Sequence, residues 1–452
     1  MIGAYFLIAT MVIIGMGPIA YEIYKKTFDF FNLKNPFIIY YIIQLGLSGI
    51  ITFSTTQPSE IGLDPINHYT TYLQSLLLSN ASLLAFQYGY YTRRKTALKI
   101  PIAFRTNWNS RKSNLFVLLL FIFGYLSLFL LLENNGGLGQ FLHDREAFRA
   151  GGMIGQGILI FPCTSLITLA ALIFFAKSTN KSKKIQQLIS IAVLIASIFP
   201  AYLLGFRSAI ALPVLQFMVL WNYGCNKIPP GKLFVLLTSV VIGFTLYGLS
   251  RQIPADLPID AALVTEVLSE NPEIAYSVIL RSKGTEVLTS VISKLDQTGD
   301  YEFGWRGVLE CLTIVFPKVL WEDKPMPASQ KFTTYFFGEM LTQSRGYDLG
   351  VWGGISPTVV GELYWHFGAF GALGGLFLLG RIAKGAYYTL RKNTSNPNVL
   401  IMYSIFFTTF SMFAEAIQGY ANALIMYVPF IILIPSLLGA NYRNKVATLA
   451  GA

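Results

Sequence analysis

The sequence predicts an all-α membrane protein, a polytopic bundle of about eleven transmembrane helices with one large helical external loop. Three observations carry this prediction: the composition, the recurrence of long apolar runs, and the distribution of charge between those runs. The chain is 54% hydrophobic and only 13% charged, whereas a soluble domain is about one quarter charged. Water is therefore not the main solvent for the surface of this protein.

The apolar runs are long enough to cross a bilayer, which takes about 20 residues as a helix. The predicted spans cover residues 2–21, 37–54, 70–91, 114–132, 156–176, 186–204, 208–223, 233–250, 357–380, 398–416 and 421–440. Eight helices thus fall in residues 1–250, an external loop occupies residues 251–356, and three helices fall in residues 357–452. Only Gly205-Phe206-Arg207-Ser208 separates the sixth span from the seventh. One long kinked helix would leave Arg207 in mid-membrane, so we expect a tight turn.

Basic residues set the orientation, because the cytoplasmic segments of membrane proteins are rich in Lys and Arg. With the N-terminus outside, the inner segments hold 22 of the 34 basic residues but only two of the 23 acids, Glu22 and Asp29. The C-terminus is then inside, and the basic residues Arg443 and Lys445 agree with that placement. The net charge of +11 therefore reflects topology, and we expect no nucleic-acid partner.

The external loop carries helix signals of its own. Asn271-Pro272-Glu273 combines an N-cap residue, a first-turn Pro and a first-turn acid. Further on, apolar residues recur on one helical face: Val287, Leu288, Val291, Ile292 and Leu295. We expect amphipathic helices that lie on, or dip into, the outer interface. A solvated lid without chemistry is the alternative.

Basic residues of the outer segments are candidates for binding a lipid-linked diphosphate at headgroup level, because guanidinium forks match phosphate oxygens. They are Arg145, Arg251, Arg281, Lys324 and Arg345. For each one, snorkelling or pairing with a nearby acid is the alternative. Arg207 stands apart, because it occupies a short turn between two apolar helices, and charge at the membrane edge is functional by default.

Two further groups of residues are candidates for substrate contact. Trp305 and Trp321 of the loop have flat faces that suit sugar rings, although Trp also anchors helices at the interface. Glu362 and His366 are four residues apart at the outer end of the ninth helix, so they share one face. A carboxylate and an imidazole there can act as base and orienting partner for a sugar hydroxyl. A structural hydrogen-bonded pair is the alternative. Gly368 and the glycines that follow indicate close helix packing.

The motifs around these residues resemble those of the Wzy-type O-antigen and oligosaccharide repeat-unit polymerases. The similar segments are Phe316-Pro317-Lys318 to Trp321, Lys324-Pro325, Ser356-Pro357-Thr358, Gly361-Glu362-Leu363-Tyr364 and Phe367-Gly368, together with Gly205-Phe206-Arg207-Ser208 and Arg281. The motif match covers residues 205–208 and 280–370, and the topology match covers nearly the whole chain. Lys318 departs from the family, in which Arg is common at that position.

The resemblance implies a glycosyltransferase without cofactors in the bacterial cytoplasmic membrane, with its active site facing the periplasm. We expect it to be metal-independent, because no outer acidic pair has clear metal-ligand spacing and Arg can replace the cation at a diphosphate. Its substrates would be undecaprenyl-diphosphate-linked glycans of an O-antigen, capsule or similar polymer. Glu362 or His366 would take the acceptor proton, with Glu362 preferred, and Arg207, Arg251 and Arg281 would clamp the diphosphate. Lys324, Arg345, Arg145, Trp305, Trp321 and Tyr364 would complete the binding site. Besides membrane lipids, a chain-length regulator is a candidate partner.

Three other classes share part of this pattern. An O-antigen ligase has the same topology and chemistry but a different acceptor. A metal-dependent polyprenyl-phosphate glycosyltransferase would carry an acidic pair in its first outer loop, where this chain has only Glu60 and Asp64, without a DxD-like unit. A flippase or other transporter would carry polar residues at mid-bilayer in several helices.

The predicted orientation is testable by labelling single cysteines with a membrane-impermeant maleimide, in a background that lacks the three native cysteines. Cysteines at Lys183 and Asn441 should be labelled only after the cells are permeabilised, because both positions lie inside. A cysteine at Asp300 should be labelled in intact cells. Labelling of the Lys183 position in intact cells would show that the orientation is the opposite of the one predicted.

Overall fold

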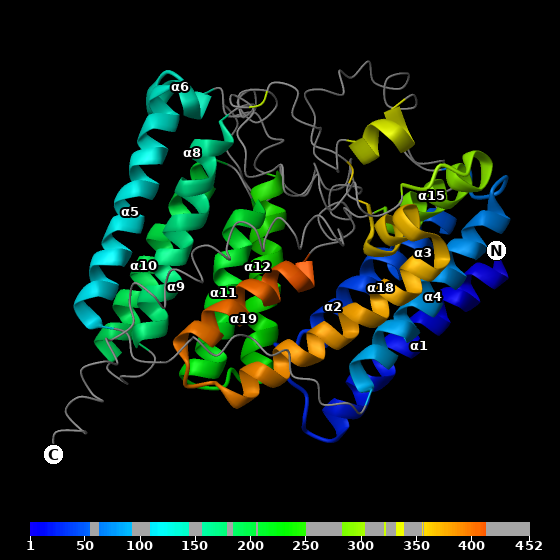
Figure 1. Ribbon diagram of the computed structural model, residues 1–452, viewed down its shortest axis with the longest axis horizontal. Helices are drawn as coiled ribbons and strands as arrows, with labels where there is room; N and C mark the ends of the chain where they lie inside the picture. Colours follow the sequence, from blue (N-terminus) through cyan, green and yellow to red (C-terminus); the bar gives the residue numbers. More distant parts are fainter. Residues whose placement is uncertain are drawn as a thin grey trace, which may run out of the picture.

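The computed structural model is a bundle of α-helices (Figure 1). The structure describes residues 1–54, 63–92, 109–143, 156–178, 184–204, 207–249, 283–302, 321, 331–338, 355 and 357–412. Every regular element within these residues is helical, so the all-α class is confirmed for the described part of the chain.

The helices that precede the external loop are α1 (Ile2–Tyr24), α2 (Lys34–Tyr41), η1 (Ile42–Leu47), α3 (Ser48–Ser54), α4 (Tyr69–Tyr91), α5 (Ser110–Glu133), α6 (Gly137–His143), α8 (Gly157–Phe161), η3 (Pro162–Leu166), α9 (Ile167–Ser178), α10 (Lys184–Leu203), α11 (Arg207–Gly224) and α12 (Pro230–Leu249). The later helices are α15 (Gly284–Thr298), α18 (Val359–Lys392) and α19 (Pro397–Met412), and residues 331–338 are also helical. Segments η1 and η3 are π-helical and continue directly from the α-helices beside them.

Ten of the predicted spans coincide with helices, whereas residues 421–440 lie outside the described residues. By length and composition alone, five described stretches could cross a membrane: Ile2–Tyr24, Lys34–Ser54, Arg111–Glu133, Ile158–Lys177 and Val359–Lys392. A multi-pass membrane protein is therefore supported, and the count of about eleven spans stays a prediction. Helices α10 and α11 are two separate helices, as expected, and residues 205–206 of the expected tight turn lie outside the described residues.

The helices form two groups with a third between them (Figure 1). One group contains α1 to α4, α15 and α18; the other contains α5, α6 and α8 to α10; helices α11, α12 and α19 lie between them. Helices α4 and α18 pack backbone against backbone because glycines line their contact. A Cβ at Gly89 would lie under 3.0 Å from the carbonyl oxygen of Phe377, and one at Gly380 equally close to that of Phe86. Small residues allow this approach between membrane helices.

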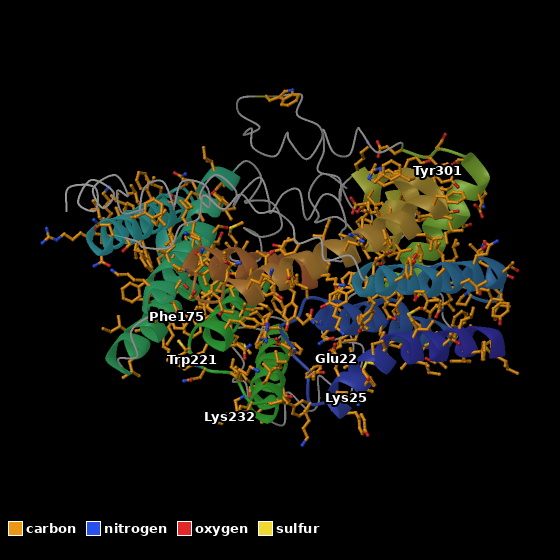
Figure 2. The ribbon with its side chains drawn as sticks, turned by 60° about the horizontal axis from the view of Figure 1, so that its bottom comes forward. Glu22, Lys25, Phe175, Trp221, Lys232 and Tyr301 are labelled. Atoms are coloured by element: carbon orange, nitrogen blue, oxygen red, sulfur yellow. The ribbon has the colours of Figure 1, made fainter. Side chains whose placement is uncertain are left out.

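The loop between α1 and α2 anchors one end of the bundle. Figure 2 shows Glu22 and Lys25 at the end of α1, and Tyr301 on the opposite side beside α15. The carboxylate of Asp29 accepts hydrogen bonds from the hydroxyls of Tyr223 on α11, at 2.7 Å, and Tyr387 on α18, at 2.8 Å.

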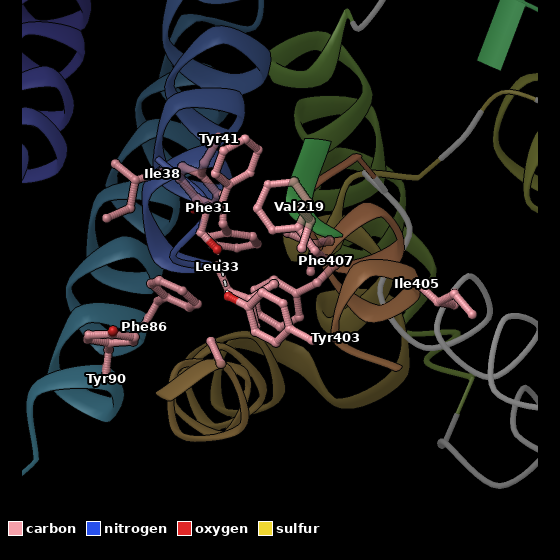
Figure 3. Packing of buried hydrophobic residues seen from close by; sticks show 14 of the residues in the cluster. Phe31, Leu33, Ile38, Tyr41, Phe86, Tyr90, Val219, Tyr403, Ile405 and Phe407 are labelled. Atoms are coloured by element: carbon pink, nitrogen blue, oxygen red, sulfur yellow. Dashed lines mark hydrogen bonds between the residues drawn. The ribbon is translucent and has the colours of Figure 1, made fainter. Parts of the chain in front are cut away.

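Aromatic packing reinforces the same end of the bundle. In Figure 3 Phe31, Phe86 and Phe407 belong to the core that joins this loop to α4 and α19, and the ring of Phe31 lies 5.7 Å from that of Phe407. The hydroxyl of Tyr403 on α19 donates to the carbonyl of Phe31 at 2.6 Å. The two inner-side acids of the predicted topology are thus engaged in structure, since Glu22 pairs with the buried Lys34 at 2.5 Å.

Helix α18 differs from the expected ninth span, which was predicted as one helix over residues 357–380. It runs to Lys392 and is broken at Gly368, whose φ of 66° and ψ of −161° only glycine adopts readily. Residues 359–367 therefore fold back on the rest of α18. The side chain of Leu363 consequently lies against Gly375, a separation in sequence that a straight helix would not bring together. Gly368 is a turn rather than a packing residue.

The α4–α18 contact predicts the effect of adding one methyl group. Gly89→Ala should lower stability by about 1–3 kcal/mol, because neither backbone can move away without cost. Gly374→Ala is the matched control, since nothing lies within 4 Å of its Cβ position. The measurement is the thermal unfolding midpoint of each purified variant in detergent. Equal midpoints for Gly89→Ala and the unmodified protein would contradict the packing described here.

Candidate functional site

Helix α15 carries the apolar face that the sequence predicted. Val287, Leu288, Val291, Ile292 and Leu295 are each at most 3% exposed. The opposite face is buried as well, with Thr285 at 1%, Glu286 at 6% and Thr289 at 0% exposure. The first half of α15 is therefore enclosed by α3, α4 and α18 instead of resting on the surface of the bundle.

The polar face of α15 is satisfied by the π-helical segment η1 and by α3. The Thr285 hydroxyl donates to the carbonyl of Leu45 at 2.6 Å and lies 2.9 Å from the hydroxyl of Ser48. The Thr52 hydroxyl donates to the Glu286 carboxylate at 2.9 Å. Such π-segments are frequent at functional sites. Here the η1 backbone accepts a bond from a neighbouring helix.

Close approach is again made possible by a glycine. A Cβ at Gly284 would lie 2.5 Å from the carbonyl oxygen of Gln44, so any other residue would push α15 away from η1. On the next turn, the Thr289 hydroxyl lies 3.0 Å from that of Ser75 on α4. These hydroxyl contacts were not predicted from the sequence. Ser48 and Thr52 lie four residues apart within an apolar span, and two polar residues on one helical face there indicate a buried polar contact.

Glu362 and His366 lie on the short first segment of α18. Thr358 caps that segment, since its hydroxyl accepts from the backbone N–H of Gly361 at 2.9 Å. The Nε2 atom of His366 is 4.0 Å from Oε1 of Glu362, and each side chain is 4% exposed. The two groups thus face each other inside the protein, as their spacing predicted, close enough to interact electrostatically but beyond a direct hydrogen bond.

The other ring nitrogen of His366 is held by the segment that follows α15. Nδ1 lies 2.7 Å from the carbonyl oxygen of Glu302. The backbone N–H of Glu302 donates to the carbonyl of Trp365 at 3.1 Å, and the Glu302 carboxylate forms an ion pair with Lys331. Trp365 packs against Phe332 and Phe336, which come from the helical residues 331–338. Three separate parts of the chain therefore fix the position of His366.

The remaining candidates are only partly placed by the structure. Tyr364 is half-buried with its ring 6.1 Å from that of Tyr301. Trp321 is 40% exposed, and Arg207 begins α11. Those outside the described residues are Arg145, Arg251, Arg281, Trp305, Lys324 and Arg345, together with the expected helix start at Asn271. The structure therefore brings Glu362, Tyr364 and His366 onto one short helix and leaves the diphosphate clamp a prediction.

Metal ligation and similarity to other proteins add no further assignment. Within the described ranges, no group of three or more His, Cys, Asp or Glu side chains could hold a metal ion. Metal independence remains an expectation from sequence. No protein-family model, curated protein or solved structure matches this chain.

The contacts of α15 predict a cost for removing one hydroxyl. Thr285→Val leaves the carbonyl of Leu45 without this donor in a buried site, and should destabilise the protein by about 1–3 kcal/mol. Gln297→Ala, at an exposed position on the same helix, is the control. Thermal unfolding of both variants in detergent measures the difference. An unchanged midpoint for Thr285→Val would show that α15 is not held by this bond.

Proposed function

We propose that this protein is a polymerase of lipid-linked oligosaccharide repeat units. It transfers the growing glycan from undecaprenyl diphosphate to the non-reducing end of a new lipid-linked unit, at the outer face of the bacterial cytoplasmic membrane. The observation that carries the proposal is the Glu362–His366 pair, 4.0 Å apart at the start of α18. This pair stands within the Gly361-Glu362-Leu363-Tyr364 motif that resembles the polymerase family.

The chemistry asks little more than positioning, charge stabilisation and a base. The lipid diphosphate is already a good leaving group, so the protein must align the acceptor hydroxyl with the anomeric carbon. Arginines supply the cationic partners of the departing diphosphate. The paired carboxylate and imidazole supply a proton acceptor for the hydroxyl, which has a high pKa.

The proposal assigns the α15 end of the bundle to the periplasmic side. The loop between α1 and α2, with Lys25 and Lys26, then lies on the cytoplasmic side, at the opposite end of the bundle (Figure 1). Basic residues favour that side. Because Glu362 and His366 are 4% exposed in this conformation, the proposal also requires that binding of the acceptor sugar uncovers them.

Glu362→Gln tests the carboxylate. Glutamine keeps the size of the side chain but cannot accept a proton or stabilise a cation, so polymerisation should fall by roughly 10²–10⁴-fold. Glu133→Gln is the matched control, because Glu133 is an exposed carboxylate that ends α5 on the α15 side. The readout is the polymer detected on gels, divided by the amount of the protein in the membrane fraction. Full activity of Glu362→Gln would reduce the carboxylate to a structural role.

The arginines provide a second test. Arg207→Ala, Arg251→Ala and Arg281→Ala should each abolish polymer while the protein remains in the membrane. Arg207→Lys should also be poor, because a point charge does not replace the guanidinium fork. The control is Arg111→Ala, which should leave polymerisation unchanged, because Arg111 is exposed at the start of α5. Normal polymer from all three outer-segment Ala variants would show that these arginines do not clamp the diphosphate.

A further inference from the structure

The backbone of Glu302 forms two hydrogen bonds with consecutive residues of the short helix of α18. Its N–H donates to the carbonyl of Trp365 at 3.1 Å, and its carbonyl oxygen lies 2.7 Å from Nδ1 of His366. A carbonyl oxygen can only accept a hydrogen bond, so Nδ1 must carry the proton. The partner of one ring nitrogen decides which nitrogen is free to titrate.

The protonation of Nδ1 determines what Nε2 of the same ring can do. Because Nδ1 is protonated in both the neutral and the charged ring, Nε2 is the atom that gains or loses a proton. Nε2 is also the atom that faces Oε1 of Glu362. A proton arriving on Nε2 would therefore create an imidazolium beside a carboxylate, and burial strengthens the attraction between them.

Helix α15 determines where Glu302 lies. The helix ends at Thr298 and is capped by Gly299, which has the left-handed conformation with φ of 70° and whose N–H donates to the carbonyl of Leu295 at 2.8 Å. Tyr301 then donates its N–H to the carbonyl of Gly299 at 2.9 Å, so the chain turns directly to Glu302. The ion pair with Lys331 holds the side chain of Glu302 in place.

We propose that Glu302 is a positioning residue whose backbone carbonyl locks His366 in the Nδ1–H tautomer, which makes Nε2 of His366 the proton acceptor of the reaction. Glu362 then stabilises the imidazolium, which reverses the preference for Glu362 as base that the sequence suggested. The tautomer stands independently of any reaction, whereas the role of Nε2 rests on the proposed function.

The transfer step balances with these residues alone. The acceptor oxygen forms a bond to the anomeric carbon of the donor glycan, and its proton moves to Nε2 of His366. The bond between the anomeric carbon and the diphosphate oxygen breaks, and the lipid diphosphate leaves with the electron pair. The imidazolium afterwards releases its proton to water, which restores the neutral ring.

The tautomer can be observed directly, because the chain contains only three histidines. The full-length protein with His68→Gln and His143→Gln leaves His366 as the single site for ¹⁵N-histidine labelling in lipid vesicles. Solid-state NMR across a pH series distinguishes protonated from unprotonated ring nitrogens. Wherever in the series the ring is neutral, we expect Nδ1 protonated and Nε2 bare. A neutral Nε2–H ring, or a ring protonated on both nitrogens throughout the series, would overturn the proposal.

Two substitutions test the role of Nε2 in the reaction. His366→Asn places an amide N–H near the Nδ1 position and lacks Nε2, so the protein should keep its thermal midpoint and lose polymerisation roughly 10²–10⁴-fold. His366→Gln loses the Nδ1 donor and should lower the midpoint as well. An active His366→Asn variant would exclude Nε2 as the acceptor. Inactivity of the unmodified protein on lipid-linked units, with the Nδ1–H tautomer present, would instead refute the polymerase and leave the tautomer standing.

Discussion

One carboxylate, that of Asp29, joins helices that are far apart in the sequence. It accepts hydrogen bonds from Tyr223 of α11 and Tyr387 of α18, while the carbonyl of Phe31, two residues further on, accepts from Tyr403 of α19. Hydrogen bonds to a charged group contribute about 1.5–3 kcal/mol each. The same helix, α18, begins with Glu362 and His366 at its other end. The Asp29 contacts therefore hold the long segment of α18, from which the short segment with Glu362 and His366 turns away at Gly368.

At the other end of the bundle, α15 and Gly368 determine where Glu362 and His366 lie. The short first segment of α18 folds back at Gly368, so Glu362 and His366 leave the axis of the long helix, and Trp365 between them joins the apolar cluster that α15 and residues 331–338 form. The first half of α15 is buried on both faces, and the turn that follows the helix brings the backbone of Glu302 to His366. The orientation of the imidazole thus depends on residues about 60 positions earlier in the chain.

Local patterns in the sequence predict part of this arrangement. The apolar period of α15 and the four-residue spacing of Glu362 and His366 are properties of a helix alone, so both can be recognised without tertiary information. Gly368 is different, because a glycine in a helical run is compatible with close packing as well as with a turn. The bonds from Glu302 and Asp29 join distant segments, and no local pattern specifies them.

The charge pattern identified Asp29 as one of only two acids on the predicted inner side, but its tyrosine partners lie 194 and 358 residues away. The Ser and Thr residues of α3 and α4 resemble Asp29 in this respect, because the sequence shows that they are unusual but does not show their partners. Within an apolar span they indicate a buried polar contact, while the identity of the partner depends on the fold. The arginines of the external loop lie outside the described residues, so their part in the site rests on sequence.

Reconstitution tests the central claim most directly. The purified protein in vesicles receives a defined undecaprenyl-diphosphate-linked repeat unit, and the products are separated by glycan length while released lipid diphosphate is quantified. The account predicts a ladder of polymers, with one lipid diphosphate released for each unit joined. Repeat units that remain single, including units that only change leaflet or move to a different acceptor, would contradict it.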